Sequence, residues 1–140
     1  MASLFTRIIE GEIPGTFVWR DERCVVFLSI GPLQRGHALV VPIEEVDHWL
    51  DLDPDLAAHL MVVAQAVGRA QVAAFGAERI GLIIAGLEVP HTHLHVLPIR
   101  SEADLDFANA GSASAADLAA AARPLRDALR AAGHPEVVDA

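Results

Sequence analysis

The segment VPHTHLHVLP, residues 89–98, places three histidines at two-residue intervals: His91, His93 and His95. In an extended strand alternate side chains share a face, so the three imidazoles are predicted to project to one side while the residues between them face the core. Successive histidines on that face lie roughly 6.6 Å apart at the backbone. This spacing flanks the middle imidazole on both sides and allows hydrogen-bond relays between the rings.

Two interpretations of the histidine pattern involve no catalysis. The histidines could lie by chance on a solvated strand face. A His-x-His pair can also present two nitrogens to zinc, which then needs a third ligand. Cys24, His37, His48 and several carboxylates are candidates for that ligand.

The third interpretation is nucleophilic catalysis. A neutral imidazole attacks phosphorus and forms a phosphoramidate that water later cleaves, which divides one difficult displacement into two easier ones. Neighbouring imidazoles can bind the phosphate oxygens, hold the nucleophile in one tautomer and pass protons to the leaving group. This interpretation explains both the number and the even spacing of the histidines, and it is the one we favour.

Composition limits the partners. A chain of 140 residues is one domain by size, and its single cysteine excludes an internal disulfide framework. Ten basic residues stand against nineteen acidic ones, for a net charge of −9, which argues against a nucleic acid polymer but not against a single nucleotide. The N-terminus carries charges in place of an apolar signal core, and no apolar run is long enough to cross a bilayer, so we expect a cytoplasmic protein that binds no membrane.

The predicted elements alternate between clustered strands and a few helices. A long helix is expected from Asp53-Pro54 to Phe75, with a capping side chain and proline at its start and Gly76 at its end. A short helix is expected between Ser3 and Gly11, and a last helix over about 114–132, which Pro124 should kink or interrupt. Strands are predicted at residues 16–21, 23–28, 37–42, 79–85 and in the histidine segment. This order favours an α+β fold with a mainly antiparallel sheet.

The histidine segment resembles a known signature. HTHLHVLP, residues 91–98, matches the His-φ-His-φ-His-φ-φ pattern of the histidine triad (HIT) superfamily, with Thr92 as the mildest deviation. Upstream, IIEGEIP and GHALVVP resemble the family's opening turn and its third strand, so the resemblance extends over roughly residues 4–100. It points to the Hint-like branch, whose members hydrolyse nucleoside phosphoramidates. It implies a HIT-like α+β fold with a five-stranded antiparallel sheet, one long helix and short terminal helices, in a homodimer. Residues 1–100 are then the HIT domain, and residues 101–140 are a C-terminal extension packed on it.

The resemblance also implies roles for individual residues. His93 is the nucleophile, which forms a covalent nucleotidyl-histidine intermediate with the α-phosphate. His91 and His95 flank it and hold phosphate oxygens, and His37 is a fourth histidine that supports the triad by hydrogen bonding. The nucleotide is expected to contact Phe5, Ile8, Ile13, Phe27 and Leu39 through its base, Ser29 through its ribose, and Glu88 and Val89 next to the triad.

The sequence departs from the family pattern at three places. Ser29 stands where an aspartate usually holds the ribose hydroxyls. Glu88 stands where a polar side chain usually contacts the phosphate or leaving group; it could recognise an amine-bearing leaving group, orient an imidazolium or face solvent. Some members carry a structural zinc site, but Thr6 stands at the position of its first cysteine and Glu45 at that of its later histidine. No metal and no cofactor are therefore expected, and His48, His59 and His134 are predicted to be solvated without a role.

These patterns predict a hydrolase that acts at the α-phosphate of purine nucleoside phosphoramidates or related adenylates. Its partners are then a purine nucleoside monophosphate or its adducts and a second copy of the chain. Two alternatives stay open: a dinucleoside polyphosphate hydrolase, and a nucleotide-binding or regulatory protein with weak or no catalysis.

Overall fold

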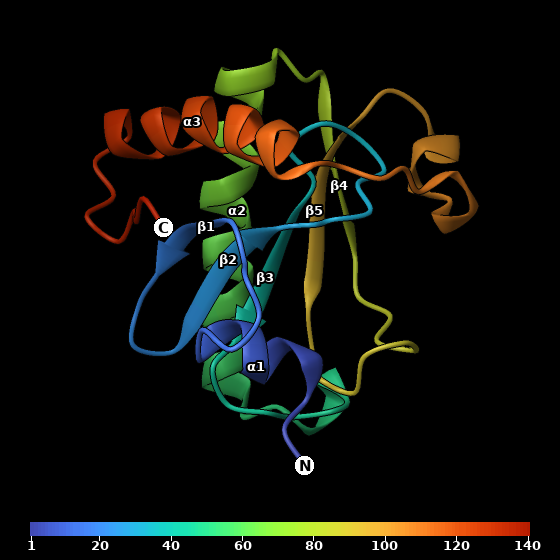
Figure 1. The fold of residues 1–140 in the computed structure, drawn as a ribbon, viewed down its shortest axis with the longest axis vertical. Helices are drawn as coiled ribbons and strands as arrows, with labels where there is room; N and C mark the ends of the chain where they lie inside the picture. Colours follow the sequence, from blue (N-terminus) through green and yellow to red (C-terminus); the bar gives the residue numbers. More distant parts are fainter.

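The computed structural model describes all residues from Met1 to Ala140. Its five strands form one antiparallel sheet in the order β1-β2-β3-β5-β4, which confirms the predicted α+β class (Figure 1). The elements in chain order are α1 (Leu4–Ile9), β1 (Phe17–Arg20), β2 (Cys24–Leu28), β3 (Ala38–Pro42), a 3-10 helix (Trp49–Asp51), α2 (Pro54–Phe75), β4 (Arg79–Ile83), β5 (Leu94–Ile99), two further 3-10 helices (Glu102–Leu105 and Phe107–Asn109) and α3 (Ala115–Ala131).

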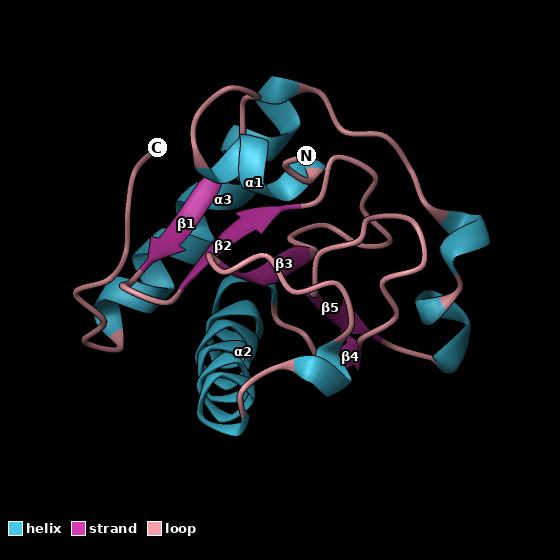
Figure 2. Cartoon of the chain, turned by 90° about the horizontal axis from the view of Figure 1, so that it is seen from below, coloured by secondary structure: helices cyan, strands magenta, loops and turns pink.

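The two faces of the sheet carry separate apolar clusters. α2 covers one face and α1 lies over the other, as Figure 2 shows with the sheet between them. Alternate residues of β2 and β3 point to opposite faces, so Val26 and Val40 pack under α2 while Phe27 and Leu39 pack on the side of α1. The smaller cluster on the α1 side contains Phe5, Ile8, Phe17, Val25, Phe27, Leu39 and Val41.

α2 is the central core helix. It begins with the Asp53 side chain capping the Asp55 N–H and ends at Gly76, whose φ of 65° is left-handed, as predicted. By length and composition it could cross a membrane, but half of its most apolar window is buried inside the protein, as in a core helix of a globular domain.

α3 differs from expectation at one point. Ser114 and Asp117 form the predicted capping box, but the helix continues through Pro124. Leu125 and Leu129 are fully buried where α3 lies across α2 (Figure 1), and this packing outweighs the one backbone hydrogen bond that a proline cannot make. Of the two predicted outcomes, a kink or an interruption at Pro124, the interruption is therefore wrong.

The last strand begins later than predicted, at Leu94, so that only His95 of the three histidines lies in it. The ladder between β3 and β5 runs from Ala38–Val96 to Val40–Leu94 and stops before Pro42, which has no N–H to donate. Beyond it, Thr92 turns to the preceding loop, where its N–H and its hydroxyl both donate to the Val46 carbonyl, at 2.7 and 2.8 Å. His91 and His93 therefore lie outside the strand, and only His91 turns inward: the rings of His93 and His95 stay side by side, with centroids 4.8 Å apart.

The C-terminal extension folds back onto the strands. The Gly111 N–H donates to the Pro32 carbonyl at 3.0 Å, and the Ala113 N–H donates to the Ile30 carbonyl at 3.1 Å. These bonds join the segment before α3 to the loop between β2 and β3. The chain end then reaches β1, where Val137 pairs with Trp19.

Candidate active site

His93 is held in one tautomer by the backbone. Its Nδ1 lies 2.7 Å from the carbonyl oxygen of His91, and because a carbonyl can only accept, Nδ1 carries the proton. Nε2 is then left with its lone pair. The His93 residue as a whole is only 6 % exposed. A desolvated imidazole with a free Nε2 is a nucleophile.

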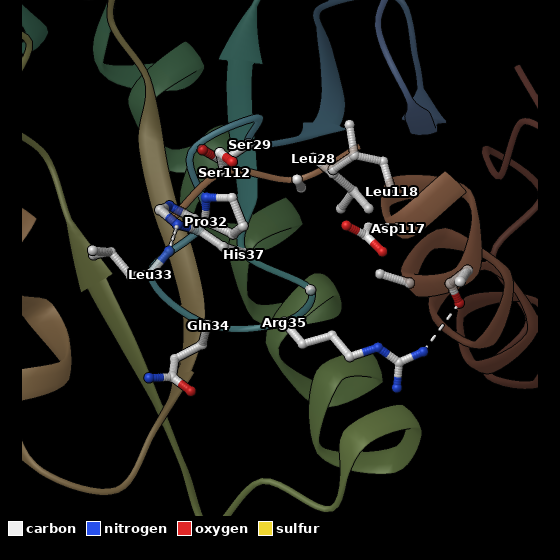
Figure 3. Close-up of a pocket in the computed structure, with 14 residues that line it drawn as sticks. Leu28, Ser29, Pro32, Leu33, Gln34, Arg35, His37, Ser112, Asp117 and Leu118 are labelled. Atoms are coloured by element: carbon white, nitrogen blue, oxygen red, sulfur yellow. Dashed lines mark hydrogen bonds between the residues drawn. The ribbon is translucent and has the colours of Figure 1, made fainter. Parts of the chain in front are cut away.

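His37 and His95 form a relay that ends in a hydrogen-bond donor. The Leu33 N–H donates to His37 Nδ1 at 3.1 Å (Figure 3), which leaves the His37 proton on Nε2. That Nε2–H donates to His95 Nδ1 at 2.9 Å. His95 must then carry its proton on Nε2. The Leu33 N–H thus fixes the tautomer of His37, and His37 fixes that of His95. His95 can then donate its Nε2–H to a phosphate oxygen.

His91 lies differently from the flanking position that the resemblance implied. It is fully buried, with Nε2 donating to the Pro42 carbonyl at 2.7 Å and Nδ1 accepting from the Ser3 hydroxyl at 2.7 Å. Both ring nitrogens are engaged inside the protein because residue 91 precedes the strand and turns inward. His91 therefore has no nitrogen left for a phosphate oxygen, and it acts on His93 through its carbonyl.

Burial keeps all four imidazoles neutral. Desolvation, assisted by the neighbouring imidazoles, lowers the pKa of His37 to about 4 and that of His95 to about 3. Burial also lowers the pKa of His91 and of His93, while the His91 carbonyl and Glu88 act on His93 in the opposite direction. At neutral pH the nucleophile and its neighbours are thus uncharged, as attack on phosphorus requires.

The charged side chains that act on the triad are carboxylates. The chain contains no lysine, and the hydrogen bonds of Arg35 and Arg126 run to carbonyls away from the histidines. Glu45 and Glu88 are the carboxylates that act on His91 and His93. Glu88 is exposed, in the loop between β4 and the triad.

The residues predicted to contact the base gather next to His93. The Phe5 ring stands edge-on to the His93 ring, with centroids 4.8 Å apart, and to Phe27 at 5.5 Å. Ile8 and Leu39 complete the same buried cluster, while Ile13 and Val89 pack against it and stay half-buried. Six of the residues predicted to contact the nucleotide therefore form one apolar cluster beside His93.

Ser29 lines a different place from the one where His93 lies. Its hydroxyl accepts from the Gly31 N–H at 3.2 Å, and with His37 it lines a cavity between the β2–β3 loop and α3 (Figure 3). Neither His93 nor His95 lines this cavity. His37 therefore takes part in both places, since it lines this cavity and its Nε2–H donates to His95.

Phe107 is a site residue that the sequence did not reveal. Its ring packs against His95, with centroids 4.9 Å apart, and the side chain is 45 % exposed. It lies in the extension, just before the residues that bond to the β2–β3 loop. The available signal was weak: Phe107 is the last phenylalanine of the chain, in an otherwise polar stretch.

Comparison with known proteins identifies the family. The HIT domain model matches residues 10–102. The chain belongs to the HIT family. It is 30% identical over 111 residues to the adenylylsulfatase HINT3 of Arabidopsis thaliana, covering 76% of this chain and 56% of the relative.

Solved structures agree with the assignment. A zinc-bound histidine triad family protein from Mycobacterium smegmatis superposes with a TM-score of 0.81 at 29% identity, covering 94% of this chain and 96% of the other. A hypothetical histidine triad nucleotide-binding protein from Sulfolobus tokodaii gives 0.80 at 25% identity, covering 91% of each chain. The recognised superfamily and the five-stranded HIT fold are thus confirmed.

The positions at which some HIT proteins hold zinc are occupied by a hydrogen-bond network in this chain. The Thr6 hydroxyl donates to Glu45 at 2.7 Å, and the Ser3 N–H donates to the same oxygen at 2.6 Å. These two bonds lower the pKa of Glu45 to about 2. Two hydroxyls, one carboxylate and an imidazole with both nitrogens engaged do not match the thiolate and imidazole ligands that structural zinc prefers. The residues at this place do not fit zinc.

The remaining histidines differ from expectation in two cases. His48 is exposed, as predicted. His59 is partly buried and lies 2.8 Å from the Asp21 carboxylate, and His134 packs on the Trp19 ring at 5.2 Å. The prediction that these two are solvated is wrong, because their partners come from the β1–β2 hairpin, far away in the sequence.

Proposed function

We propose that this HIT protein hydrolyses purine nucleoside phosphoramidates, or related adenylates, at the α-phosphate. The observation that carries the proposal is the 2.7 Å bond from His93 Nδ1 to the His91 carbonyl, which leaves His93 Nε2 free as a nucleophile. The His95 N–H set by the His37 relay stands beside it, with ring centroids 4.8 Å apart. A nucleophile and a donor for the phosphate oxygens are the minimum for phosphoryl substitution.

The reaction runs in two balanced steps. His93 Nε2 forms a bond to phosphorus while the bond from phosphorus to the leaving nitrogen breaks, and that nitrogen takes one proton from solvent and leaves as an amine. The His93 ring gains positive charge in this step, which its Nδ1–H shares with the His91 carbonyl. Water then attacks the phosphorus while the bond from phosphorus to His93 Nε2 breaks; one proton of the water returns to solvent, the nucleoside monophosphate leaves and His93 is neutral again.

The charges favour an amine as the leaving group. A sulfate or polyphosphate leaving group would depart next to Glu88, with no lysine in the chain and no arginine bonded to the triad. A neutral or cationic amine avoids this repulsion. We therefore place phosphoramidates ahead of dinucleoside polyphosphates for this chain.

A second copy of the chain is also part of the proposal. β4 is an edge strand of the sheet, and its Leu82 is exposed. On α2 the outward Met61, Val62 and Val72 are exposed as well, which is an apolar surface that a homodimer would cover. Light scattering coupled to gel filtration tests this point, with a mass of twice 14.9 kDa expected.

One observation favours a binding protein with weak catalysis as the second candidate. The Ser29 hydroxyl is already bonded to Gly31, so it offers the ribose less than a carboxylate would. Steady-state turnover of adenosine 5′-phosphoramidate, measured beside AMP binding by calorimetry, separates the two candidates. Turnover that is lost in His93→Ala supports the hydrolase, whereas AMP binding without turnover supports the second candidate.

A further inference from the structure

A second group of side chains that could bind a metal ion lies away from the triad. It consists of Asp21 in the turn between β1 and β2, Cys24 at the start of β2, and His59 on α2. One oxygen of Asp21 lies 2.8 Å from His59 Nε2 and 3.4 Å from Cys24 Sγ. The three ligand atoms lie within 4.8 Å of one another. Nothing in the phosphoryl chemistry uses them.

We propose that Asp21, Cys24 and His59 form a site for one zinc-like divalent cation. Thiolate, imidazole and carboxylate are the three ligand types that zinc accepts in proteins. This site is separate from the positions of Thr6 and Glu45 and is built from different elements.

The distances suit a tetrahedral ion. With metal–ligand bonds of about 2.0 Å to oxygen and nitrogen and about 2.3 Å to sulfur, neighbouring ligand atoms lie roughly 3.3 to 3.6 Å apart. The separation of 3.4 Å between Cys24 Sγ and Asp21 already lies in this range. The separation of 2.8 Å between His59 and Asp21 has to open by roughly half an ångström. The His59 side chain is 31% exposed, so it has room to move, and water can supply the fourth ligand from the same side.

The charges also balance. Burial opposes ionisation of Asp21, but hydrogen bonds from Trp19, Arg23, Cys24 and His59 lower its pKa to about 2. Burial and Asp21 raise the pKa of Cys24, so without a cation it is a thiol. On binding, the sulfur–hydrogen bond of Cys24 breaks, the sulfur binds the cation and one proton leaves to solvent. His59 binds through Nε2, with its remaining proton on Nδ1. Two anionic ligands then neutralise a divalent cation, which suits a partly buried site.

The surroundings hold the carboxylate in place. The backbone N–H groups of Arg23 and Cys24 both donate to the other oxygen of Asp21 at 2.8 Å. Trp19 Nε1 donates to the oxygen that faces the cluster at 2.9 Å. Such outer hydrogen bonds orient ligands in known metal sites. A bound ion would tie the β1–β2 hairpin to α2.

The test is a cobalt titration of the metal-free, full-length protein, read by the thiolate-to-cobalt charge-transfer band. The triad can bind cobalt too, but the chain has one cysteine, so this band reports Cys24 alone. We expect one cobalt per chain to produce the band, and zinc to abolish it by displacement. Cys24→Ser should remove the band, and His59→Gln should weaken binding about tenfold or more. His93→Ala and the exposed His48→Gln are matched controls that should keep it.

Each contrary outcome overturns the proposal. Cobalt that binds without the band, or no binding at all, excludes Cys24 as a ligand. A band that keeps its affinity in His59→Gln excludes His59. Far-ultraviolet circular dichroism of the two ligand variants confirms that each is folded, and an increase in Tm with zinc in the wild type but not in His59→Gln gives a second, independent readout.

Discussion

The Nδ1 of His93 lies 2.7 Å from the carbonyl oxygen of His91, two residues earlier in the chain. This bond sets the tautomer of the nucleophile with no acidic side chain. It depends on the bend that precedes β5, because a regular strand would turn the His91 carbonyl sideways toward a neighbouring strand. The late start of the strand is therefore what brings the His91 carbonyl to His93 Nδ1.

Removing the His37 relay should lower kcat while changing KM little. In His37→Phe the ring stays but His95 Nδ1 loses its donor at 2.9 Å, so the proton of His95 is no longer held on Nε2. We expect kcat for adenosine 5′-phosphoramidate to fall by about one to two orders of magnitude with KM changed little. His48→Phe is the control, since His48 is exposed. An unchanged kcat in His37→Phe would show that the relay has no catalytic part.

Glu88 should select leaving groups by charge. Two adenosine phosphoramidates of similar size, one with an ammonium group and one with a carboxylate on the amine, provide the comparison. The wild type should prefer the cationic substrate in kcat/KM, and Glu88→Gln should reduce that preference by about fivefold or more, as expected for the loss of one nearby charge. Glu78→Gln, on the β4 side of the protein, is the control. Equal preferences in wild type and Glu88→Gln would contradict the amine-leaving-group account but not hydrolysis itself.

Phe107 should affect the site more than the fold. Its ring covers one side of His95, yet it is 45 % exposed, so Phe107→Ala should cost no more than about 1 kcal/mol in the free energy of unfolding. We expect kcat/KM to fall several-fold, because water gains access to His95 and the leaving group loses an apolar wall. Urea unfolding and steady-state kinetics measure the two effects. A large loss of stability with unchanged kinetics would assign Phe107 to the fold alone.

The buried histidines make stability depend on pH. His37 and His95 have folded-state pKa values of about 4 and about 3, below the ordinary value of 6.5, so the unfolded chain binds more protons between these values. The contribution of the two neutral histidines to the free energy of unfolding is then complete above pH 6.5, and it is lost as pH falls through this window. Urea titrations between pH 7 and pH 5, above the range where carboxylates protonate, should show this decrease, and His37→Phe should reduce its slope. Stability that is constant or rises toward pH 5 would contradict the neutral, buried relay.

The predictable part of the fold is the part specified by local signals. α2 is recognised from its Asp53-Pro54 start and its Gly76 end, and α3 from the capping box of Ser114 and Asp117. These signals act within a few residues, and the alternation of apolar residues in the strands is equally local. The HIT signature predicts roles for His93, His95 and His37, and these roles stay predictions.

The rest depends on contacts between distant segments. The ladder between β3 and β5 ends at the Val40–Leu94 pair, so the pattern of residues 91–95 alone could not show where β5 begins. Phe107 reaches His95 only because Gly111 and Ala113 bond to the β2–β3 loop. His59 meets Asp21 across 38 positions of sequence. No periodicity encodes such pairs, and each changed the assignment of a residue in or near a site.

The proposed hydrolysis depends on a covalent bond between His93 and the nucleotide. Intact-mass spectrometry detects this bond in protein mixed with adenosine 5′-phosphoramidate and quenched rapidly under alkaline denaturing conditions. The wild type and His48→Ala should each give a species heavier by one adenylyl group, and His93→Ala should give none. An adduct that persists in His93→Ala, or AMP release by that variant at the wild-type rate, would contradict this mechanism.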